Sequence, residues 1–339
     1  RRRRRAVGAT GREMIVDPAT APVSGEKGLS TLHLSVAGGI TQFGAYLNTL
    51  DPGAWSSQRH WHSAEDEFIY LLSGTATLRD DTGMTDLFPG DAVSWPHGQP
   101  NGHHLTNRGD VPARWLIVGS RCRGDICTYP DDGRRQINSD TSWKIVDTGG
   151  NILKGGDLPE ELLNLRDRWG TAFDGTPRPN VIRAGSVPAI YCANNYPAQF
   201  ADLGDAEDIA LSDAGGLTQF GAFLEILHPG GQTSLRHWHE EEDEFLYVLE
   251  GAVTLVENDG PRPIGPGTCV CWPAGVPNAH CLRNDGTEPA TLFIVGSRFA
   301  EDACHYPDID LHYSRRNGLR TFAMKDGTPY PGWPKETQK

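Results

Sequence analysis

Arg236–Glu244, with the sequence RHWHEEEDE, places two histidines two positions apart and a glutamate five residues after the second. In a β-strand, residues i and i+2 point to the same face, so His237 and His239 project together. Glu244 then begins the apolar run Phe245–Leu249, which predicts a second strand. A short acidic turn between these strands brings the carboxylate back over the imidazoles. The spacing is therefore that of a metal-ligand set.

The same pattern occurs earlier in the chain, at Arg59–Glu67, which reads RHWHSAEDE. His60 and His237 are 177 residues apart. The same offset relates Thr41–Ala45 to Thr218–Ala222 and Val118–Arg121 to Val295–Arg298. Because one offset holds for all three pairs, the chain is a duplicated domain whose core carries no net insertion.

Length and turn chemistry agree with two β-rich domains. The 339 residues suit two domains of about 150 residues each. The chain has 40 glycines and 24 prolines, and turn signals such as Asp51–Gly53, Phe88–Gly90 and Asn107–Asp110 separate short alternating runs. Strands this short and numerous predict an all-β fold of the sandwich or barrel type.

The repeats and the composition divide the chain into five parts. We expect an N-terminal arm at 1–30, a first barrel at 31–145, a linker with a helix at 146–180, a second barrel at 181–312 and a C-terminal strap at 313–339. The helix is predicted at Leu158–Trp169, because Pro159 suits its first turn, Arg166 and Arg168 its last, and Gly170 ends it.

Charge and cysteine content narrow the class of protein. The formal net charge is −13 even with the run Arg1–Arg5, which we interpret as a solvated tail or start-site artefact. An acidic body argues against nucleic acid or anionic membrane as partner. No apolar run approaches the 18 or so residues that span a bilayer. Seven cysteines, an odd number, indicate free thiols. We expect a cytoplasmic homo-oligomer with a small-molecule substrate.

A second repeated stretch supplies another histidine. Gly267–Asn284 and Gly90–Asn107 each predict a strand, a Pro-Gly turn and a second strand that a histidine opens. These histidines are His280 and His103. A metal site needs more than two imidazoles and one acid, so a histidine in this repeated stretch is a candidate for a further donor.

The two stretches resemble the two motifs of the cupin superfamily. The first motif, G-x5-H-x-H-x4-E-x6-G, is matched in the second repeat by Gly231, His237, His239, Glu244 and Gly251. The second motif is matched by Gly267, Pro273, Gly275, His280 and Asn284, with four residues rather than two before the histidine. The first repeat matches with His60, His62, Glu67, Gly74, Gly90, Pro96, Gly98, His103 and Asn107. It departs from the pattern at Ala54, where a glycine is expected.

The resemblance implies a bicupin, with two antiparallel jelly-roll barrels that each hold one divalent metal. The implied ligands are His60, His62, Glu67 and His103 in one barrel and His237, His239, Glu244 and His280 in the other. Such a set suits iron, which we expect, and also manganese, cobalt, nickel, copper or zinc. Open coordination positions would accept water, O2 or a chelating substrate. Both sets are complete, and the second repeat, with the better motif, is the first choice for the chemistry.

Three functions are consistent with this reading. The first is an oxygen-dependent dioxygenase of an aromatic or enolic compound, which tryptophans and apolar barrel walls favour over a sugar. The second is a lyase, decarboxylase or isomerase in which the metal is a Lewis acid and Glu67 or Glu244 acts as acid or base. The third is a non-catalytic small-molecule-binding cupin. Fold does not select among them.

We expect structural rather than catalytic roles for most residues around the motifs. The acidic turns at Glu65–Asp66 and Glu242–Asp243 are expected to be solvated and paired with Arg59 and Arg236, although an orienting role toward a ligand imidazole is possible for them. Trp61 and Trp238 are expected in packing. The sequence does not decide whether Trp95 and Trp272 line the pocket or belong to the core. His97 and His104 are expected at the surface or the barrel mouth.

Overall fold

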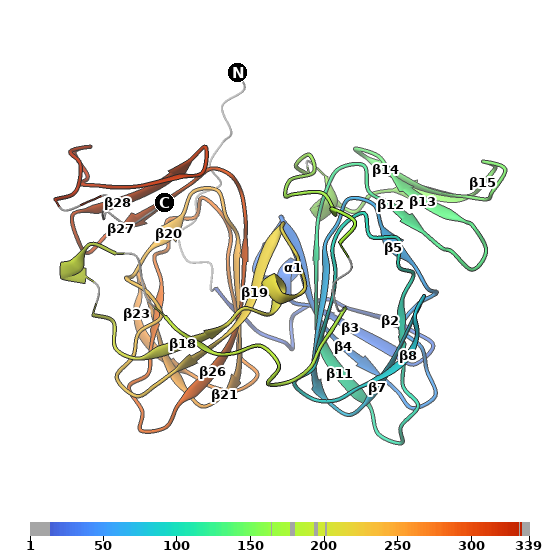
Figure 1. Ribbon diagram of the computed structural model, residues 1–339, viewed down its shortest axis with the longest axis horizontal. Helices are drawn as coiled ribbons and strands as arrows, with labels where there is room; N and C mark the ends of the chain where they lie inside the picture. The colour runs from blue at the N-terminus through green and yellow to red at the C-terminus, as the bar shows by residue number, and fades with distance from the viewer. Residues whose placement is uncertain are drawn as a thin grey trace.

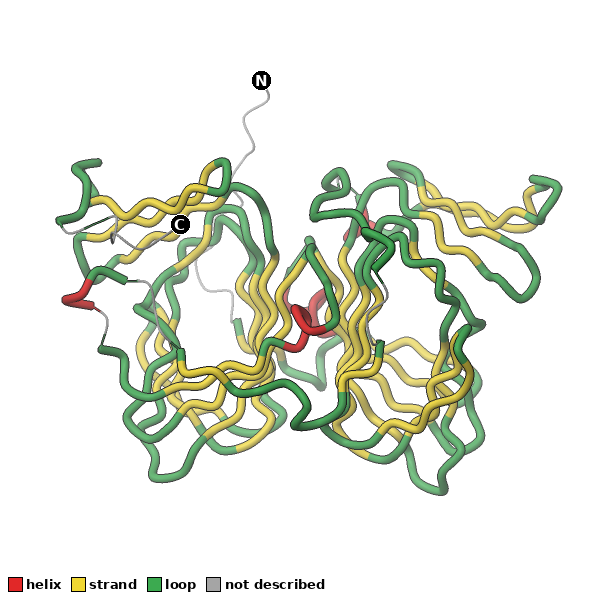
Figure 2. Tube along the Cα trace, in the orientation of Figure 1, coloured by secondary structure: helices red, strands yellow, loops and turns green. Residues whose placement is uncertain are grey.

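The computed structural model describes residues 14–331 and 333, apart from 164, 177–179, 193–195 and 201. Two β-barrels stand side by side, the first repeat in blue to green and the second in yellow to red (Figure 1). Strands make up nearly all of the regular structure in these residues, and two of the short helical segments lie between the barrels (Figure 2). The predicted all-β fold of two tandem jelly-roll barrels is confirmed.

Barrel 1 is built from three antiparallel sheets. The largest has the order β16 (Val181–Ile182), β9 (Ala92–Trp95), β6 (Glu67–Ser73), β11 (Ala113–Ser120), β4 (Phe43–Leu50), β3 (Leu29–His33) and β2 (Val23–Glu26). The second has the order β10 (His104–Thr106), β7 (Ala76–Asp80) and β8 (Gly83–Leu87). The third has the order β15 (Ile152–Asp157), β14 (Ser142–Val146), β13 (Arg135–Asn138), β12 (Ile126–Thr128) and β5 (Trp61–His62).

Barrel 2 repeats this plan. Its largest sheet has the order β1 (Ile15–Val16), β24 (Cys269–Trp272), β21 (Glu244–Glu250), β26 (Ala290–Ser297), β19 (Phe220–Leu227), β18 (Ala206–Ile209) and β17 (Ile190–Tyr191). The second has the order β23 (Gly260–Ile264), β22 (Val253–Glu257) and β25 (Cys281–Arg283). The third has the order β20 (Trp238–His239), β27 (Asp302–Tyr306), β28 (Leu311–Arg316) and β29 (Leu319–Ala323).

Each barrel has one edge strand that comes from the segment preceding the other barrel in the sequence. β1 lies within the segment expected as an arm, yet it pairs with β24 of barrel 2. β16 follows the linker and pairs with β9 of barrel 1. The exchange covers two sheet edges that would otherwise be open to other chains. At the other end of the chain, β28 crosses the boundary expected at 312.

Apolar side chains form one core in each barrel and a third between them. Strands β4 and β19 turn one face inward and the other toward the opposite barrel, as alternation along a strand requires. Phe43 and Phe220 meet between the barrels with ring centroids 6.3 Å apart, and Phe68 stacks on Phe293 at 6.0 Å. The short helices α1 (Leu34–Gly38) and α2 (Leu211–Ala214) also lie in this region.

The prediction of a helix at Leu158–Trp169 is wrong. Among the described residues of this range, only the 3₁₀ turn η1 (Glu160–Leu162) is helical, and Leu163 is already extended. An isolated helix of this length is marginal, so contacts with the barrels decide the conformation. The Arg123 amide donates to the Arg166 carbonyl at 2.9 Å, and Trp169 Nε1 donates to the Gln219 carbonyl at 2.8 Å. A second 3₁₀ turn, η2, covers Ala198–Phe200. Among the described residues, no helix has the length and apolar character needed to cross a bilayer.

Two buried aspartates join the barrels. Asp66 Oδ2 accepts the amides of Thr218 and Gln219 at 2.8 and 2.9 Å, and its Oδ1 accepts the amide and Nδ1 of His97, both at 2.7 Å. Asp66 and Asp243 are 0% and 1% exposed. The expectation that the acidic turns are solvated is therefore wrong at these two positions and at Glu242, which is 8% exposed. A surface position for His97 is also wrong, because His97 is buried.

Asp243 repeats the arrangement from the other side. Its Oδ2 accepts the amides of Thr41 and Gln42 at 2.8 and 2.9 Å, and its Oδ1 accepts the amide of Ala274 at 2.7 Å. The Gln42 side chain in turn accepts from the Asp243 amide at 2.9 Å. These bonds explain why the sequence around Thr41 recurs around Thr218, because each copy meets the aspartate of the other repeat.

We expect Asp66→Ala to lower the free energy of unfolding by about 2–4 kcal/mol, because it leaves four buried donors unpaired. Thermal and urea denaturation measure the change. The exposed Asp110 supplies the control, and Asp110→Ala should change stability by less than about 0.5 kcal/mol. Equal stability of the two variants would contradict a role of Asp66 in joining the barrels.

Candidate metal centres

The ligand candidates of each barrel converge because three local elements meet at one end of it. His62 lies on β5, Glu67 begins β6, and His60 and His103 form a two-residue bridge just before β5 and β10. In that bridge the His103 amide donates to the His60 carbonyl at 3.0 Å. His237 and His280 form the same bridge in barrel 2. The local pairing predicted from the spacing thus gathers residues 36 or more positions apart.

The predicted ligands of barrel 1 lie close together. The distance from Glu67 Oε2 to His103 Nε2 is 3.3 Å, and to His62 Nε2 it is 3.9 Å. His60, Glu67 and His103 each offer one ligand atom, and these atoms lie within 4.8 Å of one another. His62 approaches this group through Glu67, so the four side chains are candidates for ligands of one small cation.

Barrel 2 gathers its four candidates in the same way. Glu244 Oε2 is 2.8 Å from His280 Nε2 and 3.7 Å from His239 Nε2. The Nε2 atoms of His237 and His239 are 3.0 Å apart. These two imidazole nitrogens and the carboxylate oxygen are therefore arranged as candidate ligands of one metal ion.

The other ring nitrogen of most of these histidines is held by an oxygen. Nδ1 of His60 lies 2.9 Å from the Gln58 carbonyl, and Nδ1 of His237 lies 2.8 Å from the Leu235 carbonyl. Nδ1 of His103 lies 2.9 Å from the Asn101 carbonyl. A carbonyl oxygen can only accept, so Nδ1 carries the proton and Nε2 keeps its lone pair for a metal.

Burial and charge prepare the same donor set. Burial lowers the pKa of His60 to about 4 and, with the neighbouring His239, that of His237 to about 3, so both imidazoles are neutral at pH 7. Burial alone would raise the pKa of Glu67, but His103, His60 and His62 hold it at about 2.

Glu244 gives the most direct indication of a cation. Burial would raise its pKa, but His239, His280 and His237 hold it well below the usual range. Its buried Oε2 atom faces the Nε2 atoms of His280 and His239 at 2.8 and 3.7 Å. A buried carboxylate oxygen is costly unless something positive faces it. The donor set therefore fits a divalent transition metal.

Comparisons with known proteins place this arrangement in a family. The Cupin domain model matches residues 46–119 and 223–296. Protein SchB of Streptomyces halstedii is 30% identical over 121 residues, which cover 36% of this chain and 71% of SchB. The chain belongs to the cupin superfamily.

Two solved structures illustrate the likeness. The oxalate decarboxylase of Lactobacillus farciminis, solved as a formate complex, aligns over 85% of this chain and 87% of its own, with 18% identity and a TM-score of 0.52. A cupin-superfamily sugar phosphate isomerase from Silicibacter pomeroyi aligns over 43% of this chain and 92% of its own, with 39% identity and a TM-score of 0.41. The first likeness concerns the fold alone, and it confirms the bicupin architecture.

Two aspartates that the sequence analysis missed orient one imidazole in each cupin barrel. His62 Nδ1 lies 2.7 Å from Asp125 Oδ2, and His239 Nδ1 lies 2.6 Å from Asp302 Oδ2. Both aspartates are buried. Against the effect of burial, Asp125 raises the pKa of His62 well above its usual value, and Cys304, Glu244 and Asp302 together do so for His239. Their own offset of 177 residues was the available signal, since both repeats carry an acid at this position.

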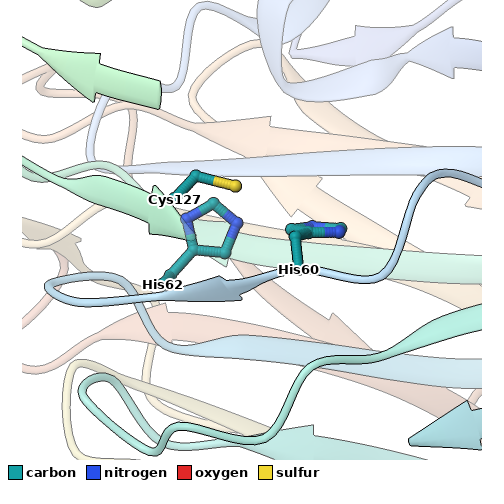
Figure 3. Close-up of side chains that lie close together, drawn as sticks. All are labelled: His60, His62 and Cys127. Carbon is teal, nitrogen blue, oxygen red and sulfur yellow. The ribbon is translucent and has the colours of Figure 1, made fainter. Parts of the chain in front are cut away.

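A cysteine lies beside the ligands in each barrel. Figure 3 shows Cys127 next to the imidazole of His62, with His60 close by, and these three residues also qualify as a group of candidate metal donors. In barrel 2, Cys304 Sγ is 3.4 Å from His239 Nδ1. All seven cysteines are free, as predicted from the odd number and the absence of a disulfide pattern.

The tryptophans before the Pro-Gly turns pack against the last histidine of each set. Trp95 stacks on His103 with centroids 3.7 Å apart, and Trp272 stacks on His280 at 3.8 Å. These rings support the ligands from one side. Trp238 is only half-buried and stacks on His305 at 4.2 Å, so it lies outside the core.

Other charged residues serve the loops rather than the metal centres. Arg59 pairs with Asp131 at 2.9 Å and with Asp81 at 3.1 Å, and Arg236 pairs with Asp308 at 2.6 Å. The expected pairing of these arginines with the acidic turns is therefore wrong. The turn residue Glu65 instead accepts the Cys122 amide at 2.9 Å.

We expect Asp125→Asn to weaken metal binding in barrel 1 by about 10–100-fold, because His62 loses the anion that fixes its orientation. Competition with a chelator, followed by elemental analysis, should leave the variant with one metal per chain under conditions where the wild type keeps two. Asp302→Asn is the matched control and should empty barrel 2 instead. Two metals per chain in both variants would contradict an orienting role for these aspartates.

Barrel 2 also carries a buried acid on its inner wall whose titration is measurable. Burial and the neighbouring Asp208 raise the pKa of Glu225 from 4.5 to about 8. The folded protein thus keeps a proton that the unfolded chain releases, so this group makes stability fall as pH rises from about 4.5 to 8. Glu225→Gln should raise the melting temperature by about 3 °C or more at pH 8 and by less at pH 5. The exposed control Glu288→Gln should show no such pH dependence.

Proposed function

We propose that this bicupin is a metal-dependent enzyme that acts on a small organic molecule in barrel 1. The observation that carries the proposal is a cavity of about 320 Å³ lined by His60, His62, Glu67 and His103. A cavity of this size suits a small ligand. The sequence favoured barrel 2 for the chemistry because its motif is more complete, whereas the cavity favours barrel 1.

The walls of the cavity favour a planar, partly apolar substrate. They include Ile69, Trp95, Trp115 and Ile117, which project inward from strands of the largest sheet. Leu158, Leu162 and Leu165 of the linker also line the cavity, and they would shield the reacting atoms from water. The finer proposal is an oxygen-dependent dioxygenase of an aromatic or enolic compound.

The residues of the chain have defined tasks in such a reaction. A divalent metal, iron being our first choice, would supply a redox centre and positions for a chelating substrate and O2. The three imidazoles would bind the metal through Nε2, His62 after losing its Nε2 proton, and Glu67 contributes an ionised carboxylate. Trp95 fixes the ring of His103 by stacking, and Asp125 fixes that of His62.

A second candidate is a lyase, decarboxylase or isomerase, in which the metal acts only as a Lewis acid. Glu65 favours it, because this acid lines the cavity without belonging to the four ligands. Its Oε2 atom is 3.8 Å from His62 Nδ1. A carboxyl group in this position could exchange protons with a bound substrate, as these reactions require.

Oxygen uptake tests the proposal. The Fe(II)-reconstituted protein should consume O2 with members of a panel of catechols and 1,3-diketones. His60→Ala should reduce the rate by at least about 100-fold through loss of the barrel 1 ligand set. The matched variant His237→Ala should retain most of the activity.

The alternatives give different results in the same assay. Turnover under anaerobic conditions would support the lyase or isomerase reading. Binding of the compounds without any turnover would contradict an enzymatic function and favour a binding protein.

A further inference from the structure

The inner wall of barrel 1 carries a polar pair that the proposed chemistry at the metal does not use. Asn48 on β4 and Trp115 on β11 are direct cross-strand partners, and both line the cavity. They are 6% and 1% exposed. Cross-strand partners share one face of the sheet, so both side chains project into the barrel.

Each member of the pair leaves one polar atom without a partner. Among the described residues, nothing donates to Asn48 Oδ1, and nothing accepts from Trp115 Nε1. Buried polar atoms without partners are uncommon in folded proteins and each carries a free-energy cost. One of these atoms accepts and the other donates, so together they match a hydroxyl group, which does both.

The second barrel shows that the pair is not required by the fold. The same cross-strand positions hold Glu225 and Leu292 in barrel 2. The same fold therefore accommodates other side chains at these two positions. The Asn–Trp pair is a property of barrel 1, where the described cavity lies.

Strand geometry places the pair away from the metal ligands. Gly119 of β11 pairs with Glu67, and Trp115 lies four residues further along the same strand. At about 3.3 Å per residue, the two positions are roughly 13 Å apart along the backbone. One six-membered ring does not cover such a distance, whereas two fused or linked rings come close to it.

We propose that Asn48 and Trp115 form a subsite for a hydroxyl group at the end of the substrate remote from the metal. This inference rests on the proposed function, in that the substrate chelates the metal of barrel 1 at its other end. It narrows the substrate class to hydroxylated compounds with two rings or an equivalent length. The hydroxyl donates to Asn48 Oδ1 and accepts from Trp115 Nε1.

Calorimetric titration of the Co(II)-loaded protein tests the subsite without any need for turnover. The probes are two matched pairs: 4-phenylcatechol with its 4′-hydroxy analogue, and 2,3-dihydroxynaphthalene with its 6-hydroxy analogue. In at least one pair, the wild type should bind the hydroxylated member about tenfold more tightly or better, because only that member satisfies both buried atoms.

Substitutions identify the groups responsible. Asn48→Leu and Trp115→Phe should each reduce the preference to within about twofold and leave the affinity for the unhydroxylated probe within about threefold. Leu292→Phe, at the position that matches Trp115 in barrel 2, should leave both affinities unchanged. Melting temperatures confirm that each variant is folded.

Three results would overturn the proposal: equal affinity of the wild type for both members of each pair, failure to bind any hydroxylated probe, or variants that lose affinity for both members equally. The last would indicate a packing role. Because binding is measured with Co(II), a preference that persists in a protein without oxygen uptake separates this proposal from the proposed function.

Discussion

The candidate metal centres depend on the oxygen atoms that hold the Nδ1 side of the imidazole rings. In five of the eight candidate ligands, an oxygen lies within 2.9 Å of Nδ1 and turns Nε2 toward the centre. Three of these oxygens are backbone carbonyls next to the histidines themselves, so the same local strand geometry that creates the spacing also fixes the tautomer. The other two belong to buried aspartates: Asp125, which directly precedes β12, and Asp302, which begins β27. The ligand set is thus arranged by the protein before any cation binds.

The two barrels share this machinery but differ in what surrounds it. The ligands, the orienting aspartates and the stacked tryptophans all occur twice, 177 residues apart. The inner walls do not: Asn48 and Trp115 in one barrel correspond to Glu225 and Leu292 in the other. Duplication preserved the candidate metal ligands and left the wall residues free to diverge. In physical terms, the ligands set what the metal can do, and the walls set what reaches it.

Sequence patterns predicted those parts of the molecule that are determined locally. Strand periodicity and the repeat point to the paired histidines and the glutamate of each barrel, because His60 and His62 need only a two-residue spacing to share a face. The third imidazoles, His103 and His280, came from the resemblance to the cupin motifs. Strand periodicity does not reveal Asp125, because it is 63 residues from His62 and meets it only in the folded barrel. It does not reveal the buried role of Asp66 either, since the partners Thr218 and Gln219 belong to the other repeat. The expected linker helix failed because its residues bond to both barrels, and no helical pattern reports such contacts.

The central claim is that each barrel binds one cation through three imidazole nitrogens and one carboxylate oxygen. Anomalous diffraction from crystals of the Co(II)-loaded protein tests it most directly. We predict two peaks per chain, each about 2.0–2.2 Å from the Nε2 atoms of three histidines and an oxygen of Glu67 or Glu244. Absence of a peak at either position in fully loaded crystals, or peaks bound by other residues, would contradict the account.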